Sequence, residues 1–281
     1  MMKQSERLKI LKKKGYILFW VDVLLEKQIT YVKNVNMLGK IDDFKTVYAV
    51  GDIHGYHEQL IRIQTKIEDD SKNSSGKKLL IYLGDYIDRG PYVKDCIQSL
   101  IDFKPPKFTI VYLLGNHEQM LLDFLAHKKS SLYLWISNGG LETLESYGNR
   151  MAEYINSNME LSFDDKIRDK FVEFLPEQHK KFFYNLKLSY TWKDYFFVHA
   201  GIDPSVPLNK QTKQTMIWTR NDKFLKSNNS FEKIVIHGHT PYKKIIKRNN
   251  RICLDTGVFF TSLLTAIKIE RPNKIEFINS L

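Results

Sequence analysis

The sequence has 281 residues, of which 43% are hydrophobic and 27% charged, an ordinary balance for a globular protein whose core needs no disulfide staples. Its two cysteines, Cys96 and Cys253, lie far apart and in no C-x-x-C pattern, which argues against a structural zinc site and favours a cytoplasmic protein with reduced thiols. The formal net charge of +11 suits nucleic acid, an anionic membrane or phosphorylated substrates, or is no more than a solvated basic surface.

Residues 1–40 are interpreted as an N-terminal extension without an assigned role. The run GYILFWVDVLL (15–25) is too short to span a bilayer and contains Asp22, and no small-x-small cleavage site follows the basic residues 12–14. We therefore expect no membrane span. The extension is a docking helix, a weak surface anchor, or upstream sequence that precedes a true start at Met37.

Five short runs rich in Val, Ile, Tyr and Phe each end in a glycine-containing polar cluster. The runs cover residues 46–50, 78–83, 108–114, 195–198 and 233–236, and their composition predicts buried strands. The clusters that follow them are GDIHG (51–55), GDYIDRG (84–90), GNHE (115–118), HAG (199–201) and HGHT (237–240).

Helices are predicted between the first three runs, at residues 57–70 and from Pro91 to about Phe103. Such a β-α-β-α-β opening predicts parallel strands, and all five clusters are expected at one sheet edge, where ligands collect. Residues 119–190 are predicted to be mainly helical, with breaks at SNGG (137–140) and SYGN (146–149). We therefore expect one catalytic domain over residues 41–281, with a helical insertion around 119–190.

The clusters carry the side-chain types that bind metal ions. Converging carboxylates repel one another and are costly to desolvate unless they are paired, and metal ions meet that need. Carboxylate, imidazole and amide ligands suit Mn²⁺, Fe or Zn²⁺. The clusters offer Asp52 and His54; Asp85, Asp88 and Arg89; Asn116, His117 and Glu118; His199; and His237 and His239.

This set predicts a hydrolase. An aspartate such as Asp85 can bridge two ions, and water between two such cations becomes hydroxide near neutral pH, which suits a phosphorus or carbonyl ester. Arg89 favours phosphorus, because a guanidinium matches phosphate oxygens in a bidentate way. His117, between a ligand-type Asn116 and an acidic residue, is placed to protonate the leaving alkoxide.

Each cluster also has a structural interpretation when it is taken alone. GDIHG can be a turn with an aspartate N-cap, and HGHT can be a glycine turn before Pro241. Glu118 can simply cap the next helix, and His199 can be a core histidine. Their recurrence in order at successive strand ends favours a shared site.

Three blocks, GDIHG, GDYIDRG and GNHE, resemble the signature of the phosphoprotein phosphatase (PPP) family within the calcineurin-like metallophosphoesterases. VHAGIDP (198–204) and HGHTP (237–241) match later elements of that pattern, so the resemblance covers roughly residues 46–270. WISNGGLETLESYG (135–148) and MIWTR (216–220) resemble the bacterial and phage branch of serine/threonine phosphatases. The resemblance implies an α/β fold with a central β-sandwich flanked by helices.

The resemblance also implies a cofactor and a set of roles. Two divalent ions are implied, Mn²⁺ foremost, with Fe or Zn²⁺ as alternatives. The implied ligands are Asp52, His54 and Asp85 for the first ion, and Asp85, Asn116, His199 and His239 for the second. The implied catalytic and phosphate-binding residues are His117 as general acid, Asp88 as its orienting partner, and Arg89 and Arg220 as phosphate grips. His237 is a neighbour of the site without a ligand role.

The expected function is hydrolysis of phosphoserine or phosphothreonine in phosphoproteins by direct attack of the hydroxide held between the ions. Leu114 stands where the eukaryotic pattern has Arg, so one phosphate-gripping group is missing. A symmetrical dinucleoside tetraphosphate hydrolase is the alternative enzyme, although such relatives typically lack the aspartate found here at Asp88. A basic nucleic-acid-binding module is the non-enzyme alternative, but no nucleic-acid-binding signature is found and no specific nucleic-acid partner is expected.

Overall fold

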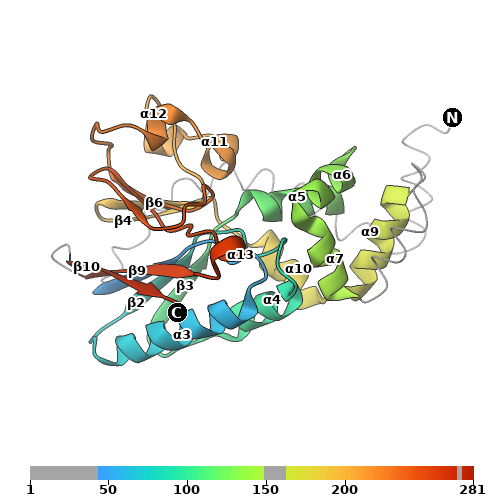
Figure 1. Cartoon of the computed structure of the whole chain (residues 1–281), viewed down its shortest axis with the longest axis horizontal. Helices are drawn as coiled ribbons and strands as arrows, with labels where there is room; N and C mark the ends of the chain where they lie inside the picture. The colour runs from blue at the N-terminus through green and yellow to red at the C-terminus, as the bar shows by residue number, and fades with distance from the viewer. Residues whose placement is uncertain (1–43, 149–162, 271–273) are drawn as a thin grey trace. The chain divides into compact units, whose positions relative to one another are not determined.

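The computed structural model describes residues 44–148, 163–270 and 274–281, in which ten strands form two five-stranded sheets (Figure 1). The first sheet has the order β10-β9-β1-β2-β3 and the second the order β4-β5-β6-β8-β7. The strands of the first sheet are β1 (Thr46–Val50), β2 (Lys78–Tyr82), β3 (Phe108–Tyr112), β9 (Thr265–Glu270) and β10 (Lys274–Asn279). Those of the second sheet are β4 (Ser189–Trp192), β5 (Tyr195–Val198), β6 (Ile234–His237), β7 (Ile246–Lys247) and β8 (Arg251–Cys253).

Strands β1, β2 and β3 are parallel, as the β-α-β-α-β opening predicts. The expectation of a single sheet edge was wrong, because β5 and β6, which are also parallel, belong to the second sheet. An apolar run in a sequence indicates a buried strand but not the strand beside which it will pair. The five polar clusters therefore lie at the carboxyl ends of strands from two sheets.

The two sheets pack against each other through alternate residues of their strands. In β1, Val47 and Ala49 belong to the core cluster shared by the two sheets, whereas Tyr48 and Val50 belong to the other cluster. Phe197 of β5 lies in the same inter-sheet cluster as Val47. This alternation follows from the two-residue period of a strand, and burial on both faces explains why the runs are continuously apolar. The expected central β-sandwich is confirmed.

Helices α3 (His57–Lys72) and α4 (Val93–Asp102) lie along the outer face of the first sheet (Figure 1). Both bury residues three or four positions apart, such as Ile63 and Ile67 in α3. Helix α3 runs two residues beyond its predicted end at residue 70. Helix α4 begins two residues after the predicted Pro91, because Tyr92 has a non-helical backbone conformation (φ −112°, ψ 43°).

The described residues between β3 and β4 are mainly helical. These helices are α5 (Asn116–Leu125), α6 (Ser131–Trp135), a π-helical turn (Ile136–Gly140), α7 (Leu141–Tyr147), α9 (Phe163–Phe174) and α10 (Glu177–Tyr184). Short helices follow β5 and β8: a 3₁₀ turn (Leu208–Lys210), α11 (Lys213–Trp218), α12 (Asp222–Leu225) and α13 (Val258–Thr261).

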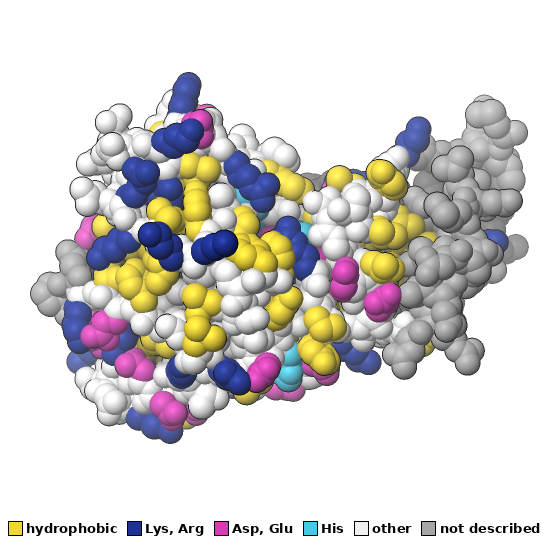
Figure 2. Space-filling view, in the orientation of Figure 1, with side chains coloured by type: hydrophobic (Ala, Val, Ile, Leu, Met, Phe, Trp, Pro, Cys, Tyr) yellow, Lys and Arg dark blue, Asp and Glu magenta, His cyan; other side chains and the backbone are white. Residues whose placement is uncertain are grey.

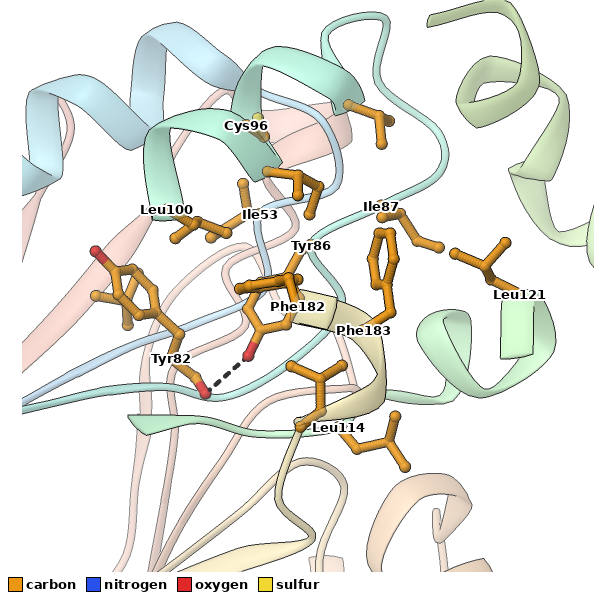
Figure 3. Packing of buried hydrophobic residues seen from close by; sticks show 14 of the residues in the cluster. Ile53, Tyr82, Tyr86, Ile87, Cys96, Leu100, Leu114, Leu121, Phe182 and Phe183 are labelled. Atoms are coloured by element: carbon orange, nitrogen blue, oxygen red, sulfur yellow. Dashed lines mark hydrogen bonds between the residues drawn. The ribbon is translucent and has the colours of Figure 1, made fainter. Parts of the chain in front are cut away.

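The loops that carry the polar clusters are anchored by their own apolar residues. Tyr86, Ile87 and Leu114 are buried in one core cluster with Phe182 and Phe183 of α10 (Figure 3). The Tyr86 hydroxyl lies 2.7 Å from the carbonyl of Leu113, which directly follows β3, and 3.2 Å from the carbonyl of Tyr82. Position 114 therefore supplies an apolar side chain to the core and no charge to a phosphate.

No helix in the described ranges is long and apolar enough to cross a membrane. The extension 1–40, with the run 15–25 and Met37, lies outside the described residues. On the face seen in Figure 2, Lys and Arg side chains are interspersed with hydrophobic ones instead of forming a single stripe. This face therefore shows no continuous basic groove of the kind that follows a nucleic-acid backbone.

Candidate metal centre

The loops that follow β1, β2, β3, β5 and β6 meet around the buried carboxylate of Asp85. Its Oδ2 lies 3.7 Å from Nε2 of His54 and 3.8 Å from Nε2 of His117, and its Oδ1 lies 3.4 Å from Nε2 of His199. These separations exceed those of direct hydrogen bonds. They are the spacings of ligand atoms that share a metal ion, each about 2.0–2.2 Å from it.

Two groups of side chains that could hold a metal ion share this aspartate. One comprises His54, Asp85 and His117, and the other comprises Asp85, His199 and His239, with the ligand atoms of each group within 4.8 Å of one another. Their common member is the residue that the sequence suggests as a bridge between two ions.

The remaining expected ligands adjoin these groups. Asp52 accepts a hydrogen bond from the backbone N–H of His239 at 3.0 Å, which links the first sheet to the second. Oδ1 of Asn116 lies 3.0 Å from Nε2 of His199. All six side chains expected to bind metal are thus brought to one place, with His117 beside them.

Several atoms of this centre fit a bound divalent ion. His54 and His199 each direct Nδ1 at a backbone carbonyl 2.9 Å away, so Nε2 of each ring faces the centre, next to Arg89 in His54 and next to Asn116 in His199. Within the described part of the chain, Oδ1 of Asp52 and Nε2 of His239 are buried atoms without a hydrogen-bond partner. An unpaired buried polar atom costs about 1–3 kcal/mol, so these two atoms favour a metal ion as their partner.

Burial and neighbouring charges set the protonation of the centre. Burial raises the pKa of Asp52, and the carboxylates of Asp255 and Asp85 raise it further. Burial also opposes ionisation of Asp85, but the surrounding imidazoles outweigh it, and the pKa of Asp85 is lowered. Burial lowers the pKa of His54 and of His239. Ionised Asp85 and neutral imidazoles are the forms in which these side chains bind metals.

The backbone of the site adopts left-handed conformations that L-residues rarely occupy. Among the described residues, ten non-glycine residues have positive φ, and half of them belong to the site. They are His54 (48°), Asp85 (52°), Asp88 (71°), Arg89 (69°) and His239 (66°). Each such residue stores about 1–3 kcal/mol of strain. Clusters of strained residues are typical of functional sites, where the direction of the side chains is kept at the expense of a low-energy backbone conformation.

His117 and Asp88 form a buried pair beside the metal ligands. Nδ1 of His117 lies 2.6 Å from Oδ2 of Asp88, so Nε2 faces the centre. Burial lowers the pKa of His117, but the carboxylates of Asp85 and Asp88 outweigh it, and the pKa is raised. The two carboxylates thus favour the protonated form of this imidazole.

Arg89 reaches across the same face of the site. Its Nη1 lies 3.2 Å from Nε2 of His54 and its Nη2 lies 3.1 Å from Nε2 of His117. The guanidinium rests on the ring of Phe259 from α13, 4.5 Å from the ring centroid. Its backbone N–H donates to the Gly139 carbonyl at 3.0 Å. The fork of this side chain is thus held towards the metal ligands.

Arg220 and His237 lie at the edge of the candidate metal centre. Arg220 is exposed, and its guanidinium donates to the backbone carbonyl of His239 at 3.1 Å. His237 is buried, and its Nε2 lies 3.0 Å from Nη1 of Arg251. Burial, and then the charge of Arg251, lowers the pKa of His237 to about 3. His237 therefore belongs to the second sheet's interior, as a neighbour of the site.

Glu118 caps helix α5, the structural role that the sequence suggested for it, and its carboxylate also binds the loop after β2. Its carboxylate accepts backbone N–H bonds from Gly115 at 3.1 Å, Asp85 at 2.9 Å, Tyr86 at 2.7 Å and Ile87 at 3.2 Å. It therefore ties the loop after β3 to the strained loop after β2. Its position in a GNHE block gave no sign of these contacts.

The sequence also gave no sign of several supporting side chains. Trp135 and Thr143, in helices after β3, contact Asp88 directly. Phe259 supports Arg89, and Asp255 is a buried carboxyl near Asp52. A Trp and a Thr at helical positions look like ordinary core residues, and only the DTG that begins at Asp255 resembles the strand-end clusters.

Comparison with known proteins agrees with this chemistry. The sequence model of a family described as calcineurin-like phosphoesterases matches residues 45–259, more than half of the chain. The serine/threonine-protein phosphatase 1 of Salmonella typhimurium is 36% identical over 98 residues, which cover 35% of this chain and 40% of that protein. This match therefore spans less than half of the relative's length.

Two similar proteins that align over more of the chain are named as tetraphosphatases instead of protein phosphatases. A bis(5'-nucleosyl)-tetraphosphatase of the asymmetrical type from Halalkalibacterium halodurans is 25% identical over 249 residues, which cover 82% of this chain and 91% of that protein. The crystal structure of a candidate diadenosine tetraphosphatase has a TM-score of 0.59 at 18% identity, and covers 85% of this chain and 96% of that one. The structural likeness establishes the fold.

Proposed function

The chain belongs to the calcineurin-like phosphoesterase family, and from that premise we propose that it is a metal-dependent serine/threonine protein phosphatase. The observation that carries the proposal is the buried pair of His117 and Asp88, 2.6 Å apart, at two candidate metal-binding groups that share Asp85, one of which includes His117. Hydrolysis of an alkyl phosphate needs an activated water and an acid for a poor leaving group, and this arrangement offers both.

The ions are assigned to the residues that converge on Asp85. Asp52, His54 and Asp85 would hold the first ion, and Asp85, Asn116, His199 and His239 the second. When bound, two divalent ions supply Lewis acidity and activate the attacking water. The donor set of oxygen and nitrogen atoms without thiolate is the basis for proposing Mn²⁺, with Fe or Zn²⁺ as alternatives.

Arg89 and Arg220 are proposed to bind the phosphate. The two Nη atoms of Arg89 already face the same side of the centre, so they can take two phosphate oxygens in a bidentate manner. Arg220 is exposed beside His239, where it can contact the phosphate from the other side. Because Leu114 is buried, these two side chains would carry the charge of the phosphate grip.

His117 is proposed as the general acid. With Nδ1 directed at Asp88, the proton that it can give to the leaving oxygen is on Nε2, the nitrogen that faces Arg89. Asp88 fixes the ring orientation and favours the doubly protonated ring by its charge. A serine or threonine alkoxide is a poor leaving group, so this proton would matter most for such substrates.

Hydrolysis of a dinucleoside tetraphosphate is the second candidate. It is favoured by one observation, the 82% of this chain that aligns with a tetraphosphatase of the asymmetrical type. The sequence alone suggested a symmetrical enzyme. The two types differ in products, since diadenosine tetraphosphate gives two ADP on symmetrical cleavage and AMP with ATP on asymmetrical cleavage.

A substrate panel under one set of metal and salt conditions tests both candidates. Phosphoserine and phosphothreonine peptides, p-nitrophenyl phosphate and diadenosine tetraphosphate are each assayed with Mn²⁺, Fe²⁺ and Zn²⁺. We expect the phosphopeptides to give the higher kcat/KM, the ratio that reports discrimination. A preference for the dinucleotide of about tenfold or more, or roughly 1.4 kcal/mol, would favour the second candidate.

A further inference from the structure

Besides His117, the carboxylate of Asp88 is bound by side chains of the helical segment 131–147, which comprises α6, the π-helical turn and α7. Asp88 is fully buried, and so are Trp135 and Thr143 from this segment. A buried carboxylate needs partners for both oxygens, and here this segment supplies them.

Trp135 binds both oxygens of the carboxylate. Its Nε1 lies 2.9 Å from Oδ1 and 3.0 Å from Oδ2 of Asp88. An indole N–H can only donate, so Asp88 must accept this bond. The bond lies across the carboxylate and opposes its rotation about the Cβ–Cγ axis.

Thr143 binds the same aspartate twice. Its Oγ1 donates to Oδ1 of Asp88 at 2.6 Å and accepts from the backbone N–H of Asp88 at 3.0 Å. The hydroxyl therefore fixes the carboxylate relative to its own backbone, where φ is 71°. With Oδ1 occupied by Thr143, Oδ2 is directed at Nδ1 of His117.

Two glycines let the segment approach this closely. A Cβ at Gly140 would lie 2.7 Å from Cδ1 of Trp135, so the indole packs directly on the glycine backbone. Gly139 has φ 100°, and a Cβ there would lie 2.9 Å from Cγ of Arg89. The same turn thus contacts Trp135, which binds Asp88, and Arg89, one of the proposed phosphate grips.

We propose that Trp135 and Thr143 are positioning residues that hold the Asp88 carboxylate in the orientation in which it aligns His117 with the leaving oxygen. This inference rests on the proposed role of His117 as the general acid. Neither residue lies against the metal-ligand groups, and both act through Asp88. Their removal should therefore lower the rate of leaving-group protonation and leave metal binding and phosphate binding in place.

The test compares Thr143→Val with Thr143→Ser in full-length, Mn²⁺-loaded protein. Valine keeps the shape and removes both hydrogen bonds, whereas serine keeps the hydroxyl. We expect Thr143→Val to lower kcat on a phosphothreonine peptide about 10- to 100-fold, as for loss of a bond to a charged group, with KM and bound Mn²⁺ unchanged. Thr143→Ser should recover most of that loss.

Leaving-group dependence separates positioning from general loosening. p-Nitrophenyl phosphate needs little protonation, so Thr143→Val should reduce its hydrolysis much less than that of the peptide. Trp135→Phe, which removes only the N–H and part of the ring, should show the same pattern if Thr143→Val fails to fold. Ser137→Ala is the matched control, because Ser137 lies in the same segment, is exposed and bonds only to the Leu134 carbonyl.

A double-mutant cycle with His117→Ala decides the route of the effect. If Thr143 acts through the acid, Thr143→Val should change the residual rate of His117→Ala by less than about twofold. An equal loss in both backgrounds, or equal losses on peptide and aryl phosphate, would overturn the inference. Wild-type protein that hydrolyses no phosphate ester with any of the three metals would instead overturn the proposed function before any variant is compared.

Discussion

The loops after the strands and the helical segment 131–147 serve the same site in different ways. The loops present Asp52, Asp85 and His199 from short turns at strand ends, and the backbone of Asp85 is in the left-handed region (φ 52°). The segment presents Trp135 and Thr143 from regular helix, at positions where both side chains are fully buried. Most of the proposed metal ligands therefore lie where the backbone is irregular, whereas Trp135 and Thr143 lie in helices. Asn116 and His117, at the start of α5, are exceptions to this contrast.

This difference explains what the sequence could predict. Polar residues that interrupt an apolar run stand out, so the runs at 46–50 and 195–198 and the clusters after them were predicted where the structure has β1, β5 and the site loops. The order of those clusters carries the family resemblance, and the resemblance implies the sandwich fold; both are confirmed.

The supporting contacts could not be predicted for a physical reason. Trp135 and Thr143 have the spacing and polarity of core residues in amphipathic helices, and their hydrogen bonds to Asp88 span 47 and 55 residues. The division of the strands between two sheets could not be predicted either, because the sequence of a buried strand does not indicate which strand it will pair with. Local sequence patterns therefore predict the elements and the polar clusters, whereas contacts between residues far apart in the sequence are known only from the three-dimensional structure.

The largest expected effect is that of Asp85→Asn in the loop after β2. Loss of the shared carboxylate charge should weaken both ions, and turnover should fall by more than the roughly 10- to 100-fold typical of residues that only support a ligand. Metal content by elemental analysis and kcat on p-nitrophenyl phosphate are measured together. Near-normal turnover with both ions retained would remove Asp85 from the bridging role.

His117→Ala, at the start of α5, should separate the proposed acid from the proposed metal ligands. We expect metal content to stay unchanged and the rate on phosphothreonine peptide to fall about 10²- to 10⁴-fold, the usual range for acid catalysis. The aryl ester should lose less. If the variant instead loses an ion, His117 is a ligand, as its place in the group with His54 and Asp85 would allow.

Gly140→Ala should disturb the helical segment through its packing alone. The new Cβ would lie 2.7 Å from Cδ1 and Cγ of Trp135, so the indole must shift. We expect this shift to lower the free energy of unfolding by about 1–3 kcal/mol. Urea denaturation measures that loss. Gly148→Ala is the control, since its Cβ would meet only the half-exposed ring of Phe174 at 3.3 Å. Equal stability of the two variants would show that the contact with Trp135 is unimportant.

Phe259→Leu should have the smallest effect of these changes. It removes the ring on which Arg89 rests, and a cation–π contact of this kind corresponds to about 2- to 30-fold in affinity. Calorimetric binding of inorganic phosphate to the Mn²⁺-loaded protein measures it. Phe260→Leu serves as the comparison, because Phe260 is exposed and packs on Phe259 instead of on Arg89. Identical losses in both variants would mean that the ring does not act through Arg89.

Metal titration of the wild-type chain tests most directly the claim that the strand-end loops carry metal-dependent chemistry. Protein treated with a chelator should hydrolyse neither p-nitrophenyl phosphate nor a phosphothreonine peptide. Added Mn²⁺ should restore turnover, which should rise with binding and saturate at about two ions per chain, as a shared carboxylate requires. Full turnover after chelation, or saturation with a single ion bound, would contradict the account.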